Sequence, residues 1–285
     1  MNGRTGSVHA LGHRFEYTEY GHGDRVVVLL HGLLFHRRMD ERLAAALAGH
    51  GYRVLCLDQL GHGGSDRPLD PAVYSMPLFA NYVLAVLDRL DIDQVVLAGR
   101  SLGANTALEV ALTAPRRLRG LIAEGPVLEG ARTAAMIAFG PFLIASAALA
   151  PAMRVIAAAT ARIPRGHNLI RDTYLDALGG DPRARSALLR GLLAGRGAPP
   201  PAARTTIRVP ALIAGYPKDP LHRDSEVRTL LAELPGSRQL RLDSMYELHT
   251  HPERPLAVIL EFLDACWADP PQPTPENTTT LGRTR

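Results

Sequence analysis

The chain has 285 residues, 46% of them hydrophobic and 21% charged, a balance that is typical of soluble globular proteins and excludes a disordered or fibrous chain. Its net charge is +4, but the basic residues are scattered and many have an acidic neighbour, so we expect no nucleic-acid partner. The length allows one large α/β domain or two small ones.

The N-terminal segment and the cysteines indicate the compartment. Residues 1–6 have no apolar segment behind their basic residue, so we find no secretory signal. Cys56 lies in an apolar strand pattern and Cys266 near the end of the last helical pattern, and two such cysteines make no disulfide framework. We therefore expect a cytoplasmic protein.

The first strand patterns predict a hairpin. Residues 15–20 alternate apolar and polar side chains, residues 21–24 read Gly-His-Gly-Asp and predict a turn, and residues 26–30 form a continuous aliphatic run. We interpret these segments as an edge hairpin that leads into a central strand.

Strand and helix patterns then alternate along the chain. Further buried strands are predicted over residues 53–57, 95–98, 118–123, 211–214 and 238–242. Helices, with apolar residues three and four positions apart, are predicted over residues 37–49, 77–90, 102–114, 225–234 and 252–267. This alternation predicts an α/β fold with a mostly parallel twisted sheet between helices, and with its chemistry in the loops at the carboxyl ends of the strands.

One long stretch interrupts the alternation. Residues 126–203 show only helical patterns, which predict an inserted helical cap between two parts of an α/β core, residues 1–125 and 204–268. The tail, residues 269–285, is rich in Pro and Thr, and we expect it to be disordered.

Part of the cap could be mistaken for a membrane span. Residues Thr133 to Met153 include no charged residue and are numerous enough to cross a bilayer. However, Gly140-Pro141 and Pro151 interrupt this run, which lies in the middle of a soluble α/β pattern. We therefore expect a buried helix and no integral membrane span.

A serine stands at a strand-to-helix junction. The segment Gly99-Arg100-Ser101-Leu102-Gly103 follows a predicted strand and opens a predicted helix, the context in which a Gly-x-Ser-x-Gly turn becomes a nucleophile elbow. The residues two before and two after such a serine must be small so that strand and helix can approach each other. Gly99 and Gly103 meet this requirement, and we predict that Ser101 is a nucleophile.

The segment His31-Gly32-Leu33-Leu34 directly follows the first central strand. A turn at this position can direct a backbone N–H at a developing oxyanion, so we predict Leu33 or Leu34 as one donor and Leu102, at the helix start, as the other. We interpret His31 as a structural histidine that bonds to loop backbone, because a base must approach the serine from another loop.

A glycine-rich segment, Asp58 to Asp66, follows the second buried strand, and its consecutive glycines predict a tight turn. His62 with Asp58 and Asp66 has the residue types of a metal site, but no further ligand cluster accompanies them. We interpret the segment as structural and predict no metal and no cofactor.

Taken in order, His31-Gly32, the turn of residues 58–65, the Ser101 elbow and an aspartate after the cap resemble the α/β-hydrolase superfamily over about residues 15–267. The chain is most similar to cap-bearing esterase, monoacylglycerol-lipase-like and epoxide-hydrolase-like members. Epoxide hydrolases and haloalkane dehalogenases carry aspartate at the elbow, so a serine there favours acyl-type chemistry.

The resemblance also implies an acid and a histidine. The acid is expected after the first strand that follows the cap, where Asp219 stands, with Glu124 before the cap as an alternative. The histidine is expected shortly before the last helix, but counting back from Pro252-Glu253, as in lipase-like relatives that read His-Glu-Leu-His, places Tyr246 there. Tyrosine has a pKa of about 10 and cannot act as the base near neutral pH.

This departure leaves three alternatives: a loop register that brings His249 to the serine, recruitment of His222, or no hydrolysis at all. We favour His249.

Two functional hypotheses follow. The first is a serine hydrolase that cleaves an ester or thioester of a hydrophobic small molecule through an acyl-enzyme on Ser101, with apolar cap helices, including residues 134–149, roofing the serine. The second, motivated by Tyr246, is a hydrolase-fold protein without an ordinary triad that acts as a non-hydrolytic cyclase, a lyase or a ligand-binding protein in specialised metabolism. The oligomeric state stays open.

Overall fold

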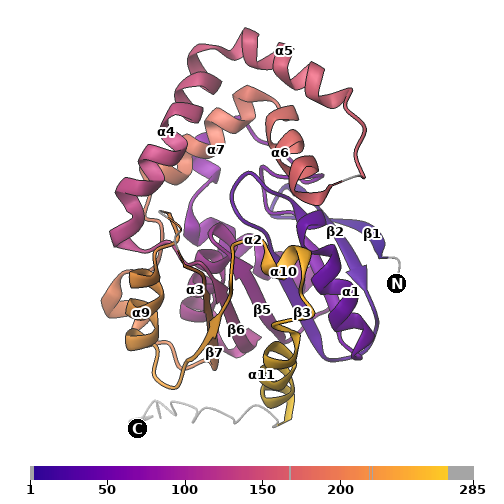
Figure 1. Cartoon of the computed structure of the whole chain (residues 1–285), viewed down its shortest axis with the longest axis vertical. Helices are drawn as coiled ribbons and strands as arrows, with labels where there is room; N and C mark the ends of the chain where they lie inside the picture. Colours follow the sequence, from indigo (N-terminus) through magenta and orange to yellow (C-terminus); the bar gives the residue numbers. More distant parts are fainter. Residues whose placement is uncertain (1–2, 167, 218, 220, 269–285) are drawn as a thin grey trace, which may run out of the picture.

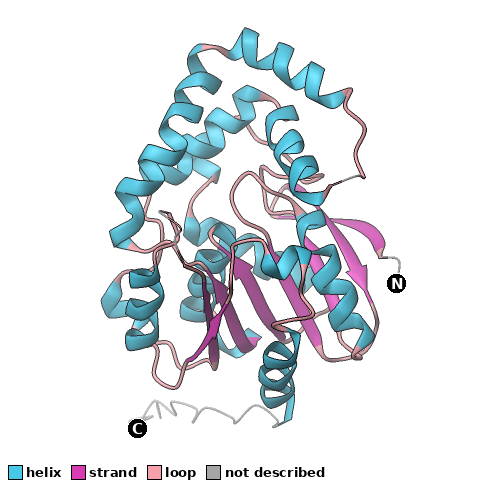
Figure 2. Cartoon of the chain, in the orientation of Figure 1, coloured by secondary structure: helices cyan, strands magenta, loops and turns pink. Residues whose placement is uncertain are grey.

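The computed structural model of the protein describes residues 3–166, 168–217, 219 and 221–268; the predicted disordered tail lies outside them. One sheet of eight strands, in the order β1-β2-β4-β3-β5-β6-β7-β8, forms the centre of the fold (Figures 1 and 2). Its strands are β1 Arg4–Ala10, β2 His13–Tyr20, β3 Val26–Leu30, β4 Arg53–Leu57, β5 Val95–Arg100, β6 Leu118–Glu124, β7 Ala211–Gly215 and β8 Arg238–Arg241. From β4 to β8 all neighbours are parallel, which confirms the predicted α/β architecture.

The predicted hairpin between residues 15–20 and residues 26–30 is wrong. Strand β2 pairs antiparallel with β1 on one side and with β4 on the other, whereas β3 lies between β4 and β5. Strand β1 was not predicted, because its sequence, Arg-Thr-Gly-Ser-Val-His-Ala, has few apolar residues. Such a composition suits an edge strand, which has only one neighbour and keeps much of its surface in water.

Strand β3 shows how the sheet buries both of its faces. Val26, Val28 and Leu30 belong to one hydrophobic cluster, and Val27 and Leu29 belong to another. Successive side chains of a strand point to opposite faces, so a run of five apolar residues requires a hydrophobic layer on each side.

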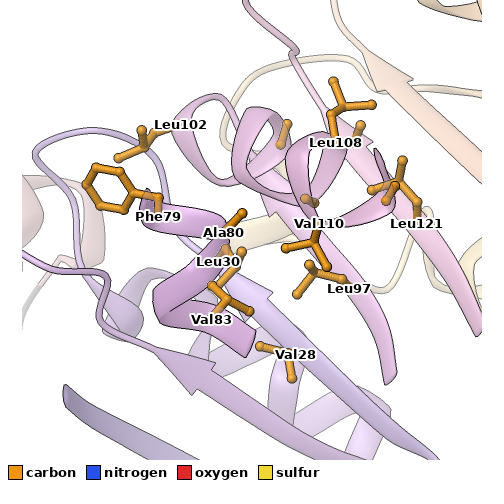
Figure 3. Packing of buried hydrophobic residues seen from close by; sticks show 14 of the residues in the cluster. Val28, Leu30, Phe79, Ala80, Val83, Leu97, Leu102, Leu108, Val110 and Leu121 are labelled. Carbon is orange, nitrogen blue, oxygen red and sulfur yellow. The ribbon is translucent and has the colours of Figure 1, made fainter. Parts of the chain in front are cut away.

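Helices supply these two layers. Helices α2 (Met76–Arg89) and α3 (Leu102–Thr113) cover the first cluster, part of which is shown in Figure 3. Helices α1 (Glu41–Gly49) and α11 (Leu256–Ala268) cover the second. Both faces are thus occupied by packing, and the loops at the strand ends are left for chemistry.

The last helix begins later than predicted. Residues 252–255 form a turn, and α11 starts at Leu256, directly after Pro255. Proline disfavours helical conformation in the residue before it, which here is Arg254, so the helix cannot continue upstream. Two further helices of the core are α9 (Asp224–Glu233) and the short α10 (Glu247–Thr250).

Between β6 and β7 the described chain forms helices and no strand, and Figure 1 shows these inserted helices together beyond one end of the sheet. They are the 3-10 turn Glu129–Ala131, α4 Arg132–Ala148, α5 Ala150–Ala161, α6 Leu169–Gly179, α7 Pro182–Ala194 and the short α8 Pro201–Arg204. The fully buried Arg204 joins the two ends of the insertion, because its guanidinium bonds to Glu129 at the entry and to Glu233 on α9.

Helices α4 and α5 expose large apolar side chains. Ile137, Ile144 and Leu149 are 72%, 66% and 58% exposed, so the prediction of a buried helix over residues 133–153 is wrong. Helix α4 packs against α7, so these side chains lie on its free side. No single helix in the described part of the chain is long and apolar enough to cross a membrane. Helices α4 and α5 together have the length and the apolar composition, but they are bent by 103° relative to each other.

Candidate active site

Ser101 occupies the corner between β5 and α3. Its φ of +51° and ψ of −108° lie in a region that non-glycine residues avoid, and its N–H donates to the Glu124 carbonyl at 2.9 Å. The packing on both sides leaves no room for side chains: a β-carbon at Gly99 would lie 2.1 Å from the Gly103 oxygen, and one at Gly103 would lie 2.1 Å from the Leu30 oxygen. The serine thus stands on a strained, tightly held elbow.

The turn after β3 lies against this corner, because a β-carbon at Gly32 would be 3.7 Å from the Ser101 Cβ. The Leu102 N–H is in the first turn of α3, where amides have no acceptor within the helix. In the described part of the chain no acceptor is found for the Leu33 N–H, and Leu34 closes the turn with a φ of +66°. The Leu33 and Leu102 amides thus lie on segments that flank the serine, and their role as oxyanion donors stays a prediction.

His31 and His62 are buried beside this turn. His31 uses Nδ1 toward the Gly32 carbonyl at 2.8 Å, and its Nε2 accepts the Gln59 N–H at 3.0 Å, which confirms its structural role. His62 Nδ1 lies 3.0 Å from the Leu60 carbonyl. Burial lowers the pKa of both imidazoles, and lowers that of His62 to about 3.

The buried His62 is expected to make the protein sensitive to acid. Its folded-state pKa of about 3 lies below the ordinary value of 6.5, so only the unfolded chain binds a proton between these values, and stability falls as the pH drops through this window. Asparagine at position 62 could still donate to the Leu60 carbonyl, so His62→Asn should remove about 2 kcal/mol of the stability lost between about pH 7.5 and about pH 5. Urea unfolding of the wild-type protein and of His62→Asn at both pH values measures the loss of stability. An equal loss in the two proteins would contradict the role of His62.

Asp219 follows β7 and holds a histidine. His222 Nδ1 lies 3.1 Å from Asp219 Oδ2, and Asp219 Oδ1 accepts the N–H groups of Leu221 and His222 at 2.8 and 3.0 Å. Burial alone would raise the pKa of Asp219, but the bonds from His222 and Leu221 lower it well below its ordinary value. An ionised acceptor at Oδ2 keeps the imidazole proton on Nδ1 and leaves Nε2 as an acceptor.

The His222 ring lies close to the serine corner. A β-carbon at Gly125 would be 3.1 Å from His222 Cδ2, and Gly125 follows Glu124, whose carbonyl accepts the Ser101 N–H. The Nε2 atom is buried and has no hydrogen-bond partner among the described residues, Ser101 included. Bonds between a nucleophile and its base are often long before substrate arrives, so the absence of a bond to Ser101 does not exclude His222 as a general base.

His249, the histidine that we favoured from the sequence, is not brought to Asp219. The short α10 packs against α1, on the face of the sheet that α1 and α11 cover. It directs the buried His249 between Asp40 and Glu124, with nitrogen-to-oxygen distances of 3.2 and 3.7 Å. The carboxylates next to His249 are those of Asp40 and Glu124, so the expected pairing of His249 with Asp219 is wrong. Glu124, the alternative acid, likewise lies beside His249 and not beside His222.

Tyr246, at the position where a histidine was expected, contacts the inserted helices. Its hydroxyl lies 2.7 Å from that of Tyr174 on α6, and burial together with this bond raises the pKa of Tyr246 to about 12. It stays protonated at neutral pH and cannot serve as a base. The Arg100 guanidinium lies 5.8 Å from the centre of the Tyr246 ring. No local sequence pattern indicates Tyr174, because the contact joins residues 72 positions apart.

The chain is similar in sequence to known hydrolases. The sequence model of a family described as alpha/beta hydrolase fold matches residues 25–241. A stretch of 136 residues is 35% identical to a 2-hydroxy-6-oxononadienedioate/2-hydroxy-6-oxononatrienedioate hydrolase of Escherichia coli (strain K12 / DH10B), covering 45% of this chain and 43% of that protein. The matches span less than half of the length of the curated relatives.

Solved structures match over nearly the whole chain. The enol-lactonase from Burkholderia xenovorans LB400 has a TM-score of 0.73 at 20% identity, over 90% of this chain and 99% of that chain. A membrane phospholipase A, described as a bacterial virulence factor, has a TM-score of 0.76 at 19% identity, over 94% and 87%. At such identities the likeness shows a shared fold.

Proposed function

The chain belongs to the alpha/beta hydrolase fold family, and we propose that it is a serine hydrolase that cleaves an ester or thioester of a hydrophobic small molecule through an acyl-enzyme on Ser101. The observation that carries this proposal is the strained Ser101 elbow next to a buried histidine that is held by an ionised aspartate. We assign the base to His222 and not to His249, and we keep Asp219 as the orienting acid.

In the proposed reaction His222 Nε2 accepts the Ser101 hydroxyl proton as Oγ attacks the substrate carbonyl carbon. The carbonyl electrons move to oxygen, where the N–H groups of Leu33 and Leu102 stabilise the negative charge. His222 then returns the proton to the leaving alcohol or thiol, and the acyl group stays on Ser101. Water, deprotonated by the same nitrogen, releases the acid and regenerates the serine.

A small cavity between the loop after β6 and the inserted helices supports an apolar group on the substrate. Its volume is about 210 Å³, and Leu128, Met136 and Leu192 are among its mostly apolar lining. Asn105 on α3 donates from its side chain to the carbonyls of Val127 and Gly197, two residues of the lining. A cavity of this size accommodates a short acyl chain.

We assign the inserted residues 126–203 the role of a cap, and residues 1–125 and 204–268 the role of the catalytic core. The hydrogen bond between Tyr174 on α6 and Tyr246 on the core supports this division, because it joins the insertion to the loop after β8. The buried free cysteines Cys56 and Cys266 support a reducing compartment such as the cytoplasm.

Covalent labelling tests the proposed function. A fluorophosphonate probe is expected to label the protein, and mass spectrometry of the digest should place the adduct on Ser101. Ser101→Ala is the matched control and should take up no probe.

The opposite result would favour the second hypothesis. A folded protein that binds no probe, and hydrolyses p-nitrophenyl acetate no faster than Ser101→Ala, would be a ligand-binding protein, a lyase or a non-hydrolytic cyclase. The Tyr246 phenol in the usual place of a histidine is the observation that keeps this alternative open.

A further inference from the structure

A larger cavity, of about 480 Å³, lies between the inserted helices and the loops of the core. Its core wall includes Leu34 and Phe35, which belong to the turn that abuts Ser101, and the glycines of residues 61–64. Its other wall comes from α6 and α7. A group bound here would therefore be attached to a substrate whose carbonyl lies at the neighbouring elbow.

More positive than negative side chains line this cavity. Five arginines face two aspartates: the arginines are Arg37, Arg38, Arg67, Arg165 and Arg185, and the aspartates are Asp176 and Asp181. Arg37 is neutralised by Asp58 and Glu16 in the core, and Asp176 is shared by Arg165 and His36. Arg38 has a partner 3.5 Å away in Glu41.

Among the described residues, Arg67 and Arg185 have no carboxylate partner. In the part of the chain that the structure describes, their guanidinium groups donate only to backbone carbonyls: Arg67 to Gly63, and Arg185 Nη2 to three carbonyls at the end of α6. Arg185 is 5% exposed, and its buried Nη1 has no hydrogen-bond partner among the described residues.

The surroundings of Arg185 do not compensate its positive charge. Burial and the nearby Arg67 lower the pKa of Arg185, and Asp181 only partly opposes this effect. The guanidinium also lies 4.6 Å from the centre of the Phe142 ring. A ring face is a weak substitute for an anion at a buried cation, so the site retains an unsatisfied positive charge.

We propose that this cavity binds an anionic group, a carboxylate or a phosphate, at the end of the substrate that is remote from the cleaved bond, with Arg67 and Arg185 as its ligands. The assignment rests on the proposed function, because it makes the cavity part of the substrate site. A planar guanidinium presents paired donors that match the oxygen atoms of either anion. The substrate is then an acyl compound with an apolar body and a charged end.

Two esters of equal length test this inference: p-nitrophenyl pentanoate, which is neutral, and mono-p-nitrophenyl glutarate, which ends in a carboxylate. We expect kcat/KM of the wild-type protein to be higher for the glutarate ester. Arg67→Gln and Arg185→Gln should each lower the ratio of the two kcat/KM values by about 10-fold to 100-fold, as expected for a lost bond to a charged group. Arg183→Gln, an exposed arginine of α7 outside this cavity, is the matched control and should keep the ratio.

Binding measurements separate this inference from the proposed function. Free glutarate and inorganic phosphate should raise the thermal unfolding temperature of the wild-type protein more than that of Arg67→Gln, and the more effective anion identifies the group. Hydrolysis of both esters with no charge preference, and no difference between the variants, would overturn the anion site and leave the hydrolase intact. Stabilisation by these anions without hydrolysis or labelling would overturn the hydrolase and leave the anion site intact.

Discussion

Replacing His222 by alanine is expected to lower kcat for p-nitrophenyl acetate by about 10⁴-fold or more. The loss follows because, in the proposed reaction, His222 Nε2 is the only acceptor for the Ser101 proton, and Asp219 holds the ring by its other nitrogen at 3.1 Å. The same loss is expected for Ser101→Ala, and the double variant should be no slower than either single one, since the two residues act as a unit.

His249→Gln is the matched control, because His249 is an equally buried histidine next to carboxylates. Its replacement is expected to lower thermal stability, but to change kcat by less than about 10-fold, since the ring has no contact with Asp219. Steady-state kinetics of both variants, after circular dichroism shows that each is folded, make the comparison. A large loss in His249→Gln together with an active His222→Ala would return the base to His249.

Replacing Arg204 by methionine is expected to lower the free energy of unfolding by about 3–5 kcal/mol, the usual effect of removing one partner from a buried ionic group. Arg204 is fully buried, and its guanidinium donates to Glu129 at 2.8 and 3.0 Å and to Glu233 at 2.6 and 2.9 Å. Without it, the Glu233 carboxylate, whose side chain is 14% exposed, is left without this partner, whereas the Glu129 side chain is 54% exposed and stays in contact with water. Urea unfolding followed by circular dichroism measures the loss.

Two further variants separate this effect from a general sensitivity of the region. Arg208→Met changes an exposed arginine four positions away whose hydrogen bonds, within the described part of the chain, go only to nearby carbonyls, and it should alter stability by less than about 0.5 kcal/mol. Adding Glu129→Gln and Glu233→Gln to Arg204→Met should recover most of the loss, because no carboxylate is then left unpaired. Equal losses in Arg204→Met and Arg208→Met would contradict the assigned role.

Local patterns predicted most of the core. The runs of residues 26–30 and 53–57 are β3 and β4 to the residue, because a strand buried on both faces is apolar at its buried positions, and only the half-buried Arg53 at the start of β4 is polar. Local patterns do not predict which strands lie next to each other in the sheet. The error at β2 arose because an alternating strand and a nearby turn fit an antiparallel neighbour on either side, and only the whole sheet decides which neighbour is present.

In the candidate site, too, a local pattern predicts one part, the elbow, but not the other, the base. The elbow is a constraint on five consecutive residues, and Gly99 and Gly103 reveal it because any larger side chain there would strike backbone. The base is not constrained in this way. His222 and His249 both follow strands at the same end of the sheet, and no pattern within either loop tells which ring turns toward the serine.

The sequence by itself therefore determined the parallel core, the Ser101 corner and Asp219 as the acid that we propose, since each depends on residue types at fixed short spacing. Only the tertiary structure decided that Asp219 pairs with His222 and that α10 directs His249 to Asp40 and Glu124. It alone also decided that Arg67 and Arg185 line one cavity, with hydrogen bonds among the described residues to backbone carbonyls only. These contacts join segments far apart in the chain, and their geometry is fixed by how loops and helices pack on the sheet rather than by any local spacing.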